Sequence, residues 1–272
     1  MAAMRYLRRV YTAPDDSREV LAAALWEAGT LGLEEAAELV AWFAAAPPAI
    51  DLPAGVALRS EGWVDGVDWL AGYRAAAQPL AVGERLWLDP REPDAPPIEA
   101  PPGRLALRVP ARTAFGTGSH ASTRLALRLL EAASLSGATV LDIGAGSGVL
   151  SLAALGLGAR GAIGLDVDPA AALLSGQHAR LNGLPAAFWA GSLAALAPTA
   201  RFAFVVVNAL PHEVLAEAAA IAAAVAPGGR LVVSGVPAVE EQPVLAAWAA
   251  VGLAPAARLA EEEWVAWSLE RR

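Results

Sequence analysis

The chain has 272 residues, a formal net charge of −8 and 56% apolar residues, which is enough material for a large domain with a further module. All 20 basic residues are Arg, and the chain has no Cys and three His. Chemistry that needs a lysine Schiff base, a P-loop lysine, a cysteine nucleophile or an iron–sulfur cluster is therefore excluded. We expect no metal site, and the acidic charge favours a basic substrate over a nucleic-acid partner.

The first 55 residues predict a small module of one helix and several strands. Residues 4–11 alternate like a strand, and residues 15–28 predict a helix that begins with acidic and Ser caps and ends at a glycine. Residues 31–35 and 38–43 predict two further short strands, before a stretch rich in Pro and Gly at 47–55. Residues 1–11 lack the apolar stretch of a signal peptide and later apolar runs are shorter than a membrane span, so we expect a cytoplasmic protein without a membrane partner.

The middle of the chain predicts a connecting region. Residues 66–77 predict a short helix and residues 80–88 a strand. Residues 90–103 contain six Pro, which excludes a helix or a central strand. We expect this loop to join 80–88 to a strand at 105–109 as an irregular hairpin.

From residue 119 onward, strands of four to seven residues alternate with helices, a pattern typical of a parallel α/β sheet. The predicted helices cover residues 121–133, 149–157, 169–182, 212–226 and 239–251, and the predicted strands cover 139–143, 162–167, 187–190, 202–208, 230–234 and 263–269.

The strongest local signal is VLDIGAGSG at residues 140–148, where a buried strand runs into a GxGxG loop and a helix. Glycines allow a tight turn and a close approach of backbone to a ligand. Val149 breaks the GxGxxG spacing of dinucleotide-binding proteins, so an NAD-dependent dehydrogenase is the least favoured class. The loop is instead typical of S-adenosyl-L-methionine (AdoMet) methyltransferases, although a turn without a ligand stays possible from the loop alone.

Polar residues end the strands that follow the glycine loop. Asp166 comes 22 residues after Gly144, where a carboxylate can accept both ribose hydroxyls of a nucleoside. Asp168 is more readily explained as the cap of the helix that begins at Pro169. Asn208 ends a later strand, where ligands bind in open α/β sheets, although it could also cap a helix.

A further candidate segment reads AFGTGSHAST at residues 114–123 and opens a helix. Its Ser and Thr could serve only as helix caps, and His120 alone is more often structural than catalytic.

These motifs together resemble the PrmA family, whose members methylate ribosomal protein eleven of the large subunit. The resemblance rests on AFGTGxHxxT, LDIGAGSGVLSLAA, GLDVDP and a strand that ends in Asn, and it covers about residues 65–236. It implies a Rossmann-like seven-strand domain at 104–272, a small substrate-recognition domain at 1–58, and a linker helix with a Pro-rich hairpin at 59–103.

The resemblance also implies the roles of individual residues. By position, the AdoMet contacts fall on Thr123, Gly144, Gly146, Asp166 and Asn208, with Phe115 and the glycines after it covering the cofactor and Ser192 beside the adenine. For this reaction the attacking amine must be neutral, and we expect Asn208 and nearby carbonyls to orient it. No strong general base is evident, and His120 is a weak candidate for a proton acceptor.

Several alternatives stay open. Ala111 and Arg112 stand where the family has Pro-Gly, which leaves room for a non-catalytic AdoMet-binding protein. The substrate could also be another protein lysine or a small molecule, although a separate amino-terminal module argues against a small molecule. The expectation is a monomeric protein N-methyltransferase with AdoMet as cofactor and a large-subunit ribosomal protein as partner.

Overall fold

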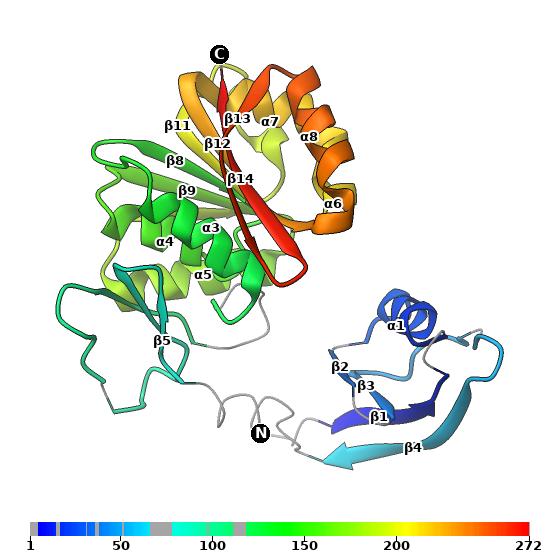
Figure 1. Ribbon diagram of the computed structural model, residues 1–272. Helices are drawn as coiled ribbons and strands as arrows, with labels where there is room; N and C mark the ends of the chain where they lie inside the picture. The colour runs from blue at the N-terminus through cyan, green and yellow to red at the C-terminus, as the bar shows by residue number, and fades with distance from the viewer. Residues whose placement is uncertain are drawn as a thin grey trace. The chain divides into compact units, whose positions relative to one another are not determined.

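The structure is a computed structural model, and it forms two compact units, Met1–Gly72 and Tyr73–Arg272 (Figure 1). The helix expected at 66–77 and the residues 111–117, which include Phe115, lie outside the described residues. The residues that the structure describes are 5–14, 17–30, 32–35, 38–50, 52–65, 78–96, 98–110 and 118–271.

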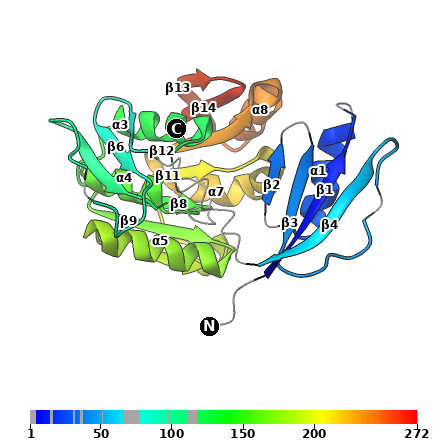
Figure 2. The same cartoon turned by 90° about the horizontal axis from the view of Figure 1, so that it is seen from below.

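The first unit is a four-stranded antiparallel sheet with one helix packed on it. Its strand order is β2-β3-β1-β4, which can be followed across the unit in Figure 2. Leu7 and Phe43 of the sheet pack with Leu21 and Leu25 of the helix in a buried core, because alternate strand residues point to one face. The elements are β1 (Arg5–Thr12), α1 (Arg18–Glu27), β2 (Gly32–Glu35), β3 (Leu39–Phe43) and β4 (Ala57–Asp65).

Strand β4 was not expected from the sequence. It pairs with β1 along its length, from Arg5 opposite Asp65 to Thr12 opposite Ala57. Its sequence, ALRSEGWVD, carries polar residues and a glycine, as an edge strand with one solvated side allows. The first unit consequently runs past the expected limit at residue 58.

The second unit begins with a small three-stranded sheet, β5 (Leu80–Val82), β6 (Leu86–Asp89) and β7 (Leu105–Arg108). The single strand expected at 80–88 was wrong, because Gly83 adopts a positive φ of 58° and the chain reverses into an antiparallel pair. The expected hairpin to 105–109 was also wrong. Strands β6 and β7 are parallel, so the Pro-rich loop is a crossover that carries the chain back.

The main sheet has seven strands in the order β10-β9-β8-β11-β12-β14-β13. All neighbours are parallel except β14, which is antiparallel to both β12 and β13. The strands are β8 (Thr139–Ile143), β9 (Gly161–Asp166), β10 (Ala187–Ala190), β11 (Phe202–Asn208), β12 (Val225–Pro237), β13 (Leu253–Glu261) and β14 (Trp264–Arg271). This topology confirms the expected Rossmann-like methyltransferase fold.

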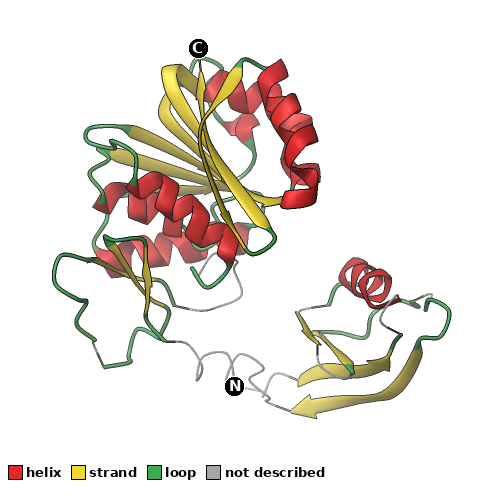
Figure 3. Ribbon diagram, in the orientation of Figure 1, coloured by secondary structure: helices red, strands yellow, loops and turns green. Residues whose placement is uncertain are grey.

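Helices cover both faces of this sheet (Figure 3). Successive strand residues alternate between two buried clusters: Val140 and Val206 face one set of helices, whereas Leu141 and Val207 face the other. The strands are apolar on both faces, as is typical of buried parallel sheets. The first set is α3 (Ala121–Glu131), α4 (Val149–Gly156) and α5 (Pro169–Asn182), and the second is α6 (Pro211–Val214), α7 (Ala218–Ala224) and α8 (Glu241–Ala250).

The carboxy-terminal part differs from the expectations in two places. The helix expected at 212–226 is split into α6, a 3₁₀ turn at Leu215–Glu217 and α7. Strand β13 was not expected, and it contains Pro255, which is tolerated because β13 lies at the sheet edge and a bulge follows Pro255. No helix among the described residues is long and apolar enough to cross a membrane.

Candidate functional site

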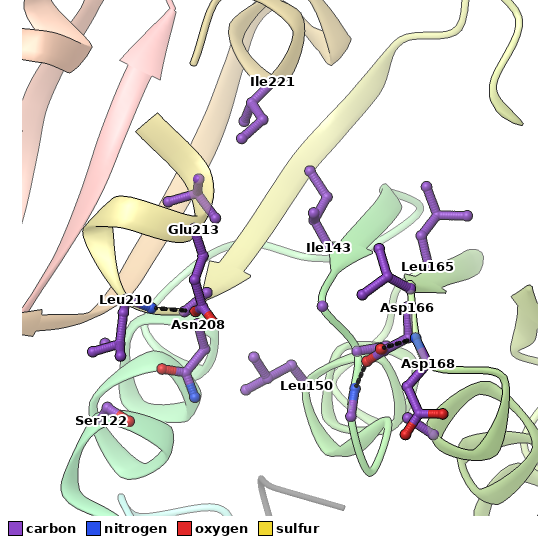
Figure 4. A pocket seen from close by; sticks show the side chains of 18 of the residues that line it. Ser122, Ile143, Leu150, Leu165, Asp166, Asp168, Asn208, Leu210, Glu213 and Ile221 are labelled. Atoms are coloured by element: carbon purple, nitrogen blue, oxygen red, sulfur yellow. Dashed lines mark hydrogen bonds between the residues drawn. The ribbon is translucent and has the colours of Figure 1, made fainter. Parts of the chain in front are cut away.

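A cavity of about 630 Å³ lies at the carboxyl ends of β8, β9 and β11. The sheet order reverses between β8 and β11, and a crevice of this kind is where open α/β sheets bind ligands. Figure 4 shows Asp166 and Asp168 at one end of the cavity and Asn208, Leu210 and Glu213 at the other. Ile143 and Leu150 lie between the two groups and give the middle an apolar lining.

The glycine loop lines this cavity, and its glycines have different structural roles. Gly144 has a φ of 70°, it lines the cavity, and an added Cβ would meet no atom within 4 Å. Gly148 has a φ of 79°, but a Cβ there would come within 2.8 Å of Phe188 and Ser175. The first glycine therefore leaves space for a ligand, and the last one allows the loop to pack against β10 and α5.

Asp166 is held rigidly at the end of β9. Its Oδ2 accepts a hydrogen bond of 2.8 Å from the N–H of Gly146, and its Oδ1 accepts one of 2.9 Å from the N–H of Asp168. Each carboxylate oxygen keeps a second lone pair for a ligand hydroxyl. Asp168 caps α5 through a 2.8 Å bond from the N–H of Ala170, which confirms the capping role expected for it.

At the other end, Asn208 and Thr123 meet although 85 residues separate them. Asn208 Nδ2 donates to Thr123 Oγ1 at 3.2 Å, while the buried Oδ1 of Asn208 has no hydrogen-bond partner among the described residues. The hydroxyl of Ser234, on β12 beside β11, donates to the carbonyl of Ser122 at 2.7 Å. These two bonds fix the start of α3 against the sheet and leave a fixed acceptor, Asn208 Oδ1, for a ligand donor.

His120 lines the cavity as the amino-terminal cap of α3. The N–H of Ser122 donates to its Nδ1, so the neutral imidazole carries its proton on Nε2. Burial, followed by the nearby Arg124 guanidinium, lowers the pKa of His120 below its ordinary value. A neutral ring of this tautomer presents a donor, which argues against the role of proton acceptor.

A hairpin from the end of the chain packs over His120. Trp264 lies edge-on to the His120 ring, with centroids 4.9 Å apart, and it lines the cavity too. Arg124 joins α3 to the hairpin through Glu261, with Nε and Oε1 2.7 Å apart, and through Glu262 at 3.3 Å. This contact could not be predicted from the sequence, because Trp264 is only one apolar residue in a predicted strand.

A fully buried carboxyl supports the glycine loop from behind. Asp142 Oδ2 accepts hydrogen bonds from the N–H and hydroxyl of Ser151 at 3.1 and 2.9 Å, which ties β8 to α4. Burial raises the pKa of Asp142 to about 6, although the bonds from Ser151 oppose the rise. Asp142 does not line the cavity, so its role in the described structure is to hold the loop in place.

The other expected site residues fall as follows. Gly146 and Ser192 line the cavity, and the Oγ of Ser192 accepts from the N–H of Ala194 at 3.4 Å. Phe115 lies outside the described residues. Glu213 and Glu217, two carboxylates that line the Asn208 end, were not predicted as site residues. A Glu in a predicted helix is ordinarily assigned to the solvent-exposed face of that helix.

The donor set fits AdoMet. Among the described lining residues, Asp166 offers a carboxylate for ribose, Gly144 leaves open space, and no Arg is present to repel a sulfonium. A seven-stranded sheet of this order, with a GxGxG loop after β8 and a carboxylate ending β9, defines a class I methyltransferase, an enzyme that uses AdoMet.

The chain belongs to the PrmA family, described as ribosomal protein L11 methyltransferase, whose sequence profile matches residues 34–272. The L11 methyltransferase of Geobacter metallireducens is 35% identical over 256 residues, which cover 94% of this chain and 79% of that protein. That of Cupriavidus metallidurans is 39% identical over 186 residues, 68% of this chain and 59% of that protein. The crystal structure of a ribosomal protein L11 methylase from Lactobacillus delbrueckii subsp. bulgaricus shares the fold, with a TM-score of 0.65 and 22% identity over 72% of this chain and 98% of that chain.

Proposed function

We propose that this protein transfers methyl groups from AdoMet to amine groups of ribosomal protein L11, on lysine side chains, the amino-terminal α-amine, or both. The observation that carries the proposal is the buried Asn208 Oδ1, a hydrogen-bond acceptor without a partner at one end of a cavity whose other end holds Asp166. The L11 methyltransferases that resemble the chain support the choice of substrate.

The cofactor would lie between these two ends. Asp166 would accept the ribose hydroxyls on the lone pairs that its backbone contacts leave, and Gly144 would face the amino-acid end. Ser192 and its neighbour Leu193 line the cavity beside Asp166, where the adenine would lie. When bound, AdoMet supplies an electrophilic methyl group carried on a sulfonium.

The residues at the Asn208 end would prepare the amine. Its nucleophilic form is neutral, whereas a lysine with an ordinary pKa of about 10.4 is charged at neutral pH. Apolar Leu210, Val214 and Trp264 line this end, and desolvation lowers the pKa of an amine. Asn208 Oδ1 would accept an amine N–H and so orient the nitrogen lone pair, and such positioning contributes up to about 7–11 kcal/mol in well-oriented systems.

We further propose that the amino-terminal unit recognises the substrate protein. Its own sheet and core support a separate docking module. The expected arrangement is a monomer that acts in the cytoplasm without a nucleic-acid or membrane partner. The net charge of −8 suits a basic ribosomal protein.

Acceptor specificity tests the proposal. Tritiated AdoMet is supplied with native L11 or with L11 whose amines have been acetylated. Native L11 should gain label and acetylated L11 should not. Equal labelling of both proteins would contradict methylation of amines, and no labelling of native L11 would contradict the choice of substrate.

A further inference from the structure

The cavity lining carries charge of one sign. The described lining residues include the carboxylates Asp166, Asp168, Glu213 and Glu217 but no Arg. The only other titratable side chain among them is His120, whose pKa is lowered by burial and by Arg124, so that its charged form is disfavoured. The proposed function uses Asp166 for the ribose, and Asp168 caps α5, so the two glutamates are the charges without an assigned role.

Glu213 is fixed beside Asn208. It lies on α6, directly after the loop that follows β11, and its Oε2 accepts a hydrogen bond of 2.9 Å from the N–H of Leu210. Figure 4 shows its side chain extending toward Asn208 and Leu210. The side chain is exposed, and its Oε1 accepts no hydrogen bond from the described residues. Glu217, one turn further along, accepts no hydrogen bond from any residue that the structure describes.

The Asn208 end therefore offers two acceptors of different kinds: a neutral amide oxygen and a negative carboxylate. A carbonyl oxygen accepts from a neutral or a charged amine, whereas a carboxylate strongly prefers an ammonium ion. Charged partners shorten and strengthen hydrogen bonds, so the exposed carboxylate of Glu213 favours a cationic amine at this end of the cavity.

We propose that Glu213 binds the substrate amine in its protonated form and delivers it to Asn208, which makes Glu213 a specificity residue for cationic amine substrates. This inference rests on the proposed function. Glu213 contributes to the binding of the substrate amine, because its carboxylate favours the ammonium form. The bound amine must still lose its proton before it attacks the methyl group. Loss of the charge should weaken substrate binding without weakening the chemical step.

A capping role is the competing explanation, since Glu213 stabilises the start of α6 through its bond to the N–H of Leu210. The two explanations separate in Glu213→Gln. The Gln carbonyl still accepts from Leu210, but the negative charge is gone. Glu240→Gln is the matched control, because Glu240 is an exposed carboxylate of the same unit outside the cavity lining.

The experiment is a steady-state titration of L11 at saturating AdoMet across pH, with wild type, Glu213→Gln and Glu240→Gln. For Glu213→Gln the KM for L11 should rise about twofold to fivefold, as expected for a charged hydrogen bond made by an exposed side chain. The pH of half-maximal kcat should fall by roughly half a unit, since a carboxylate that stabilises the bound ammonium has been removed. AdoMet affinity, measured by calorimetry, and the Tm should stay unchanged, and Glu240→Gln should match wild type throughout.

The outcomes are distinct. A Glu213→Gln enzyme with the KM and pH profile of Glu240→Gln overturns the role of Glu213 and leaves the proposed function standing. If Glu213→Gln lowers the Tm, Glu213→Asp decides, because it retains the charge and shortens the reach to Leu210: a KM nearer wild type than that of Glu213→Gln supports the proposal, and an equal or higher KM overturns it. A wild-type enzyme that does not methylate L11 overturns both the proposed function and this inference.

Discussion

Replacing Asp166 by Asn should weaken the binding of AdoMet by about 100-fold. Asp166 would accept two ribose hydroxyls while its oxygens also accept the N–H groups of Gly146 and Asp168. An Asn side chain has no charge, and its NH₂ group must face one of these N–H donors. Hydrogen bonds to charged groups contribute about 1.5–3 kcal/mol each. The Asn variant loses the negative charge of the carboxylate and one acceptor oxygen, which costs roughly 3 kcal/mol, or a factor of about 100 in AdoMet affinity.

Calorimetric titration of the purified variant with AdoMet measures this change. The matched control is Asp168→Asn, which removes the same charge two residues away in the same cavity but keeps the cap of α5, because Asn is as good a cap as Asp. The control should change the affinity by less than about fivefold. Equal losses in the two variants would refute the assignment of Asp166 to the ribose.

Three other changes test the fold. Asp142→Asn should stabilise the protein at pH 7 by up to roughly 3 kcal/mol, but hardly at pH 4. Folding raises the pKa of Asp142 from 3.8 to about 6, so its carboxyl becomes progressively destabilising as the pH rises through that window. Urea unfolding at both pH values measures it, and a gain independent of pH would count against the buried charge. Glu262→Gly should raise the free energy of unfolding by about 1 kcal/mol, because Glu262 adopts a strained φ of 54° that glycine adopts freely. A clear loss of stability would show that the contacts of the Glu262 side chain outweigh this backbone strain. Gly148→Ala should cost roughly 3 kcal/mol by forcing a Cβ against Phe188 at positive φ, whereas Gly161→Ala, with open space and no positive φ, should cost less than about 1 kcal/mol in the same assay.

The alternating βα pattern could be read from the sequence because each element there carries its own local signal. Strands β8, β9 and β11 are short apolar runs buried on both faces, and each leads to a turn. The edge strands β4 and β13 lack that signal. Their polar residues and Pro255 are tolerated only because the strands pair on one side, which is a property of the sheet as a whole.

The candidate site divides in the same way. Gly144, Asp166 and Asn208 could be placed because topology alone brings the carboxyl ends of neighbouring parallel strands together. The bond between Asn208 and Thr123 spans 85 residues, and the contact of Trp264 with His120 joins the last hairpin to α3. Such pairings depend on how the helices and the final hairpin pack, so no local sequence pattern predicts them.

The amine-methyltransfer reaction itself is tested most directly by the intact mass of L11 after incubation with AdoMet and the purified protein. Methylation of L11 by this protein predicts that L11 gains whole methyl units with the wild type, and that Asn208→Ala, which removes the amide that would orient the amine, slows this gain at least tenfold. An unchanged mass of L11, with AdoMet binding still measurable by calorimetry, would contradict it.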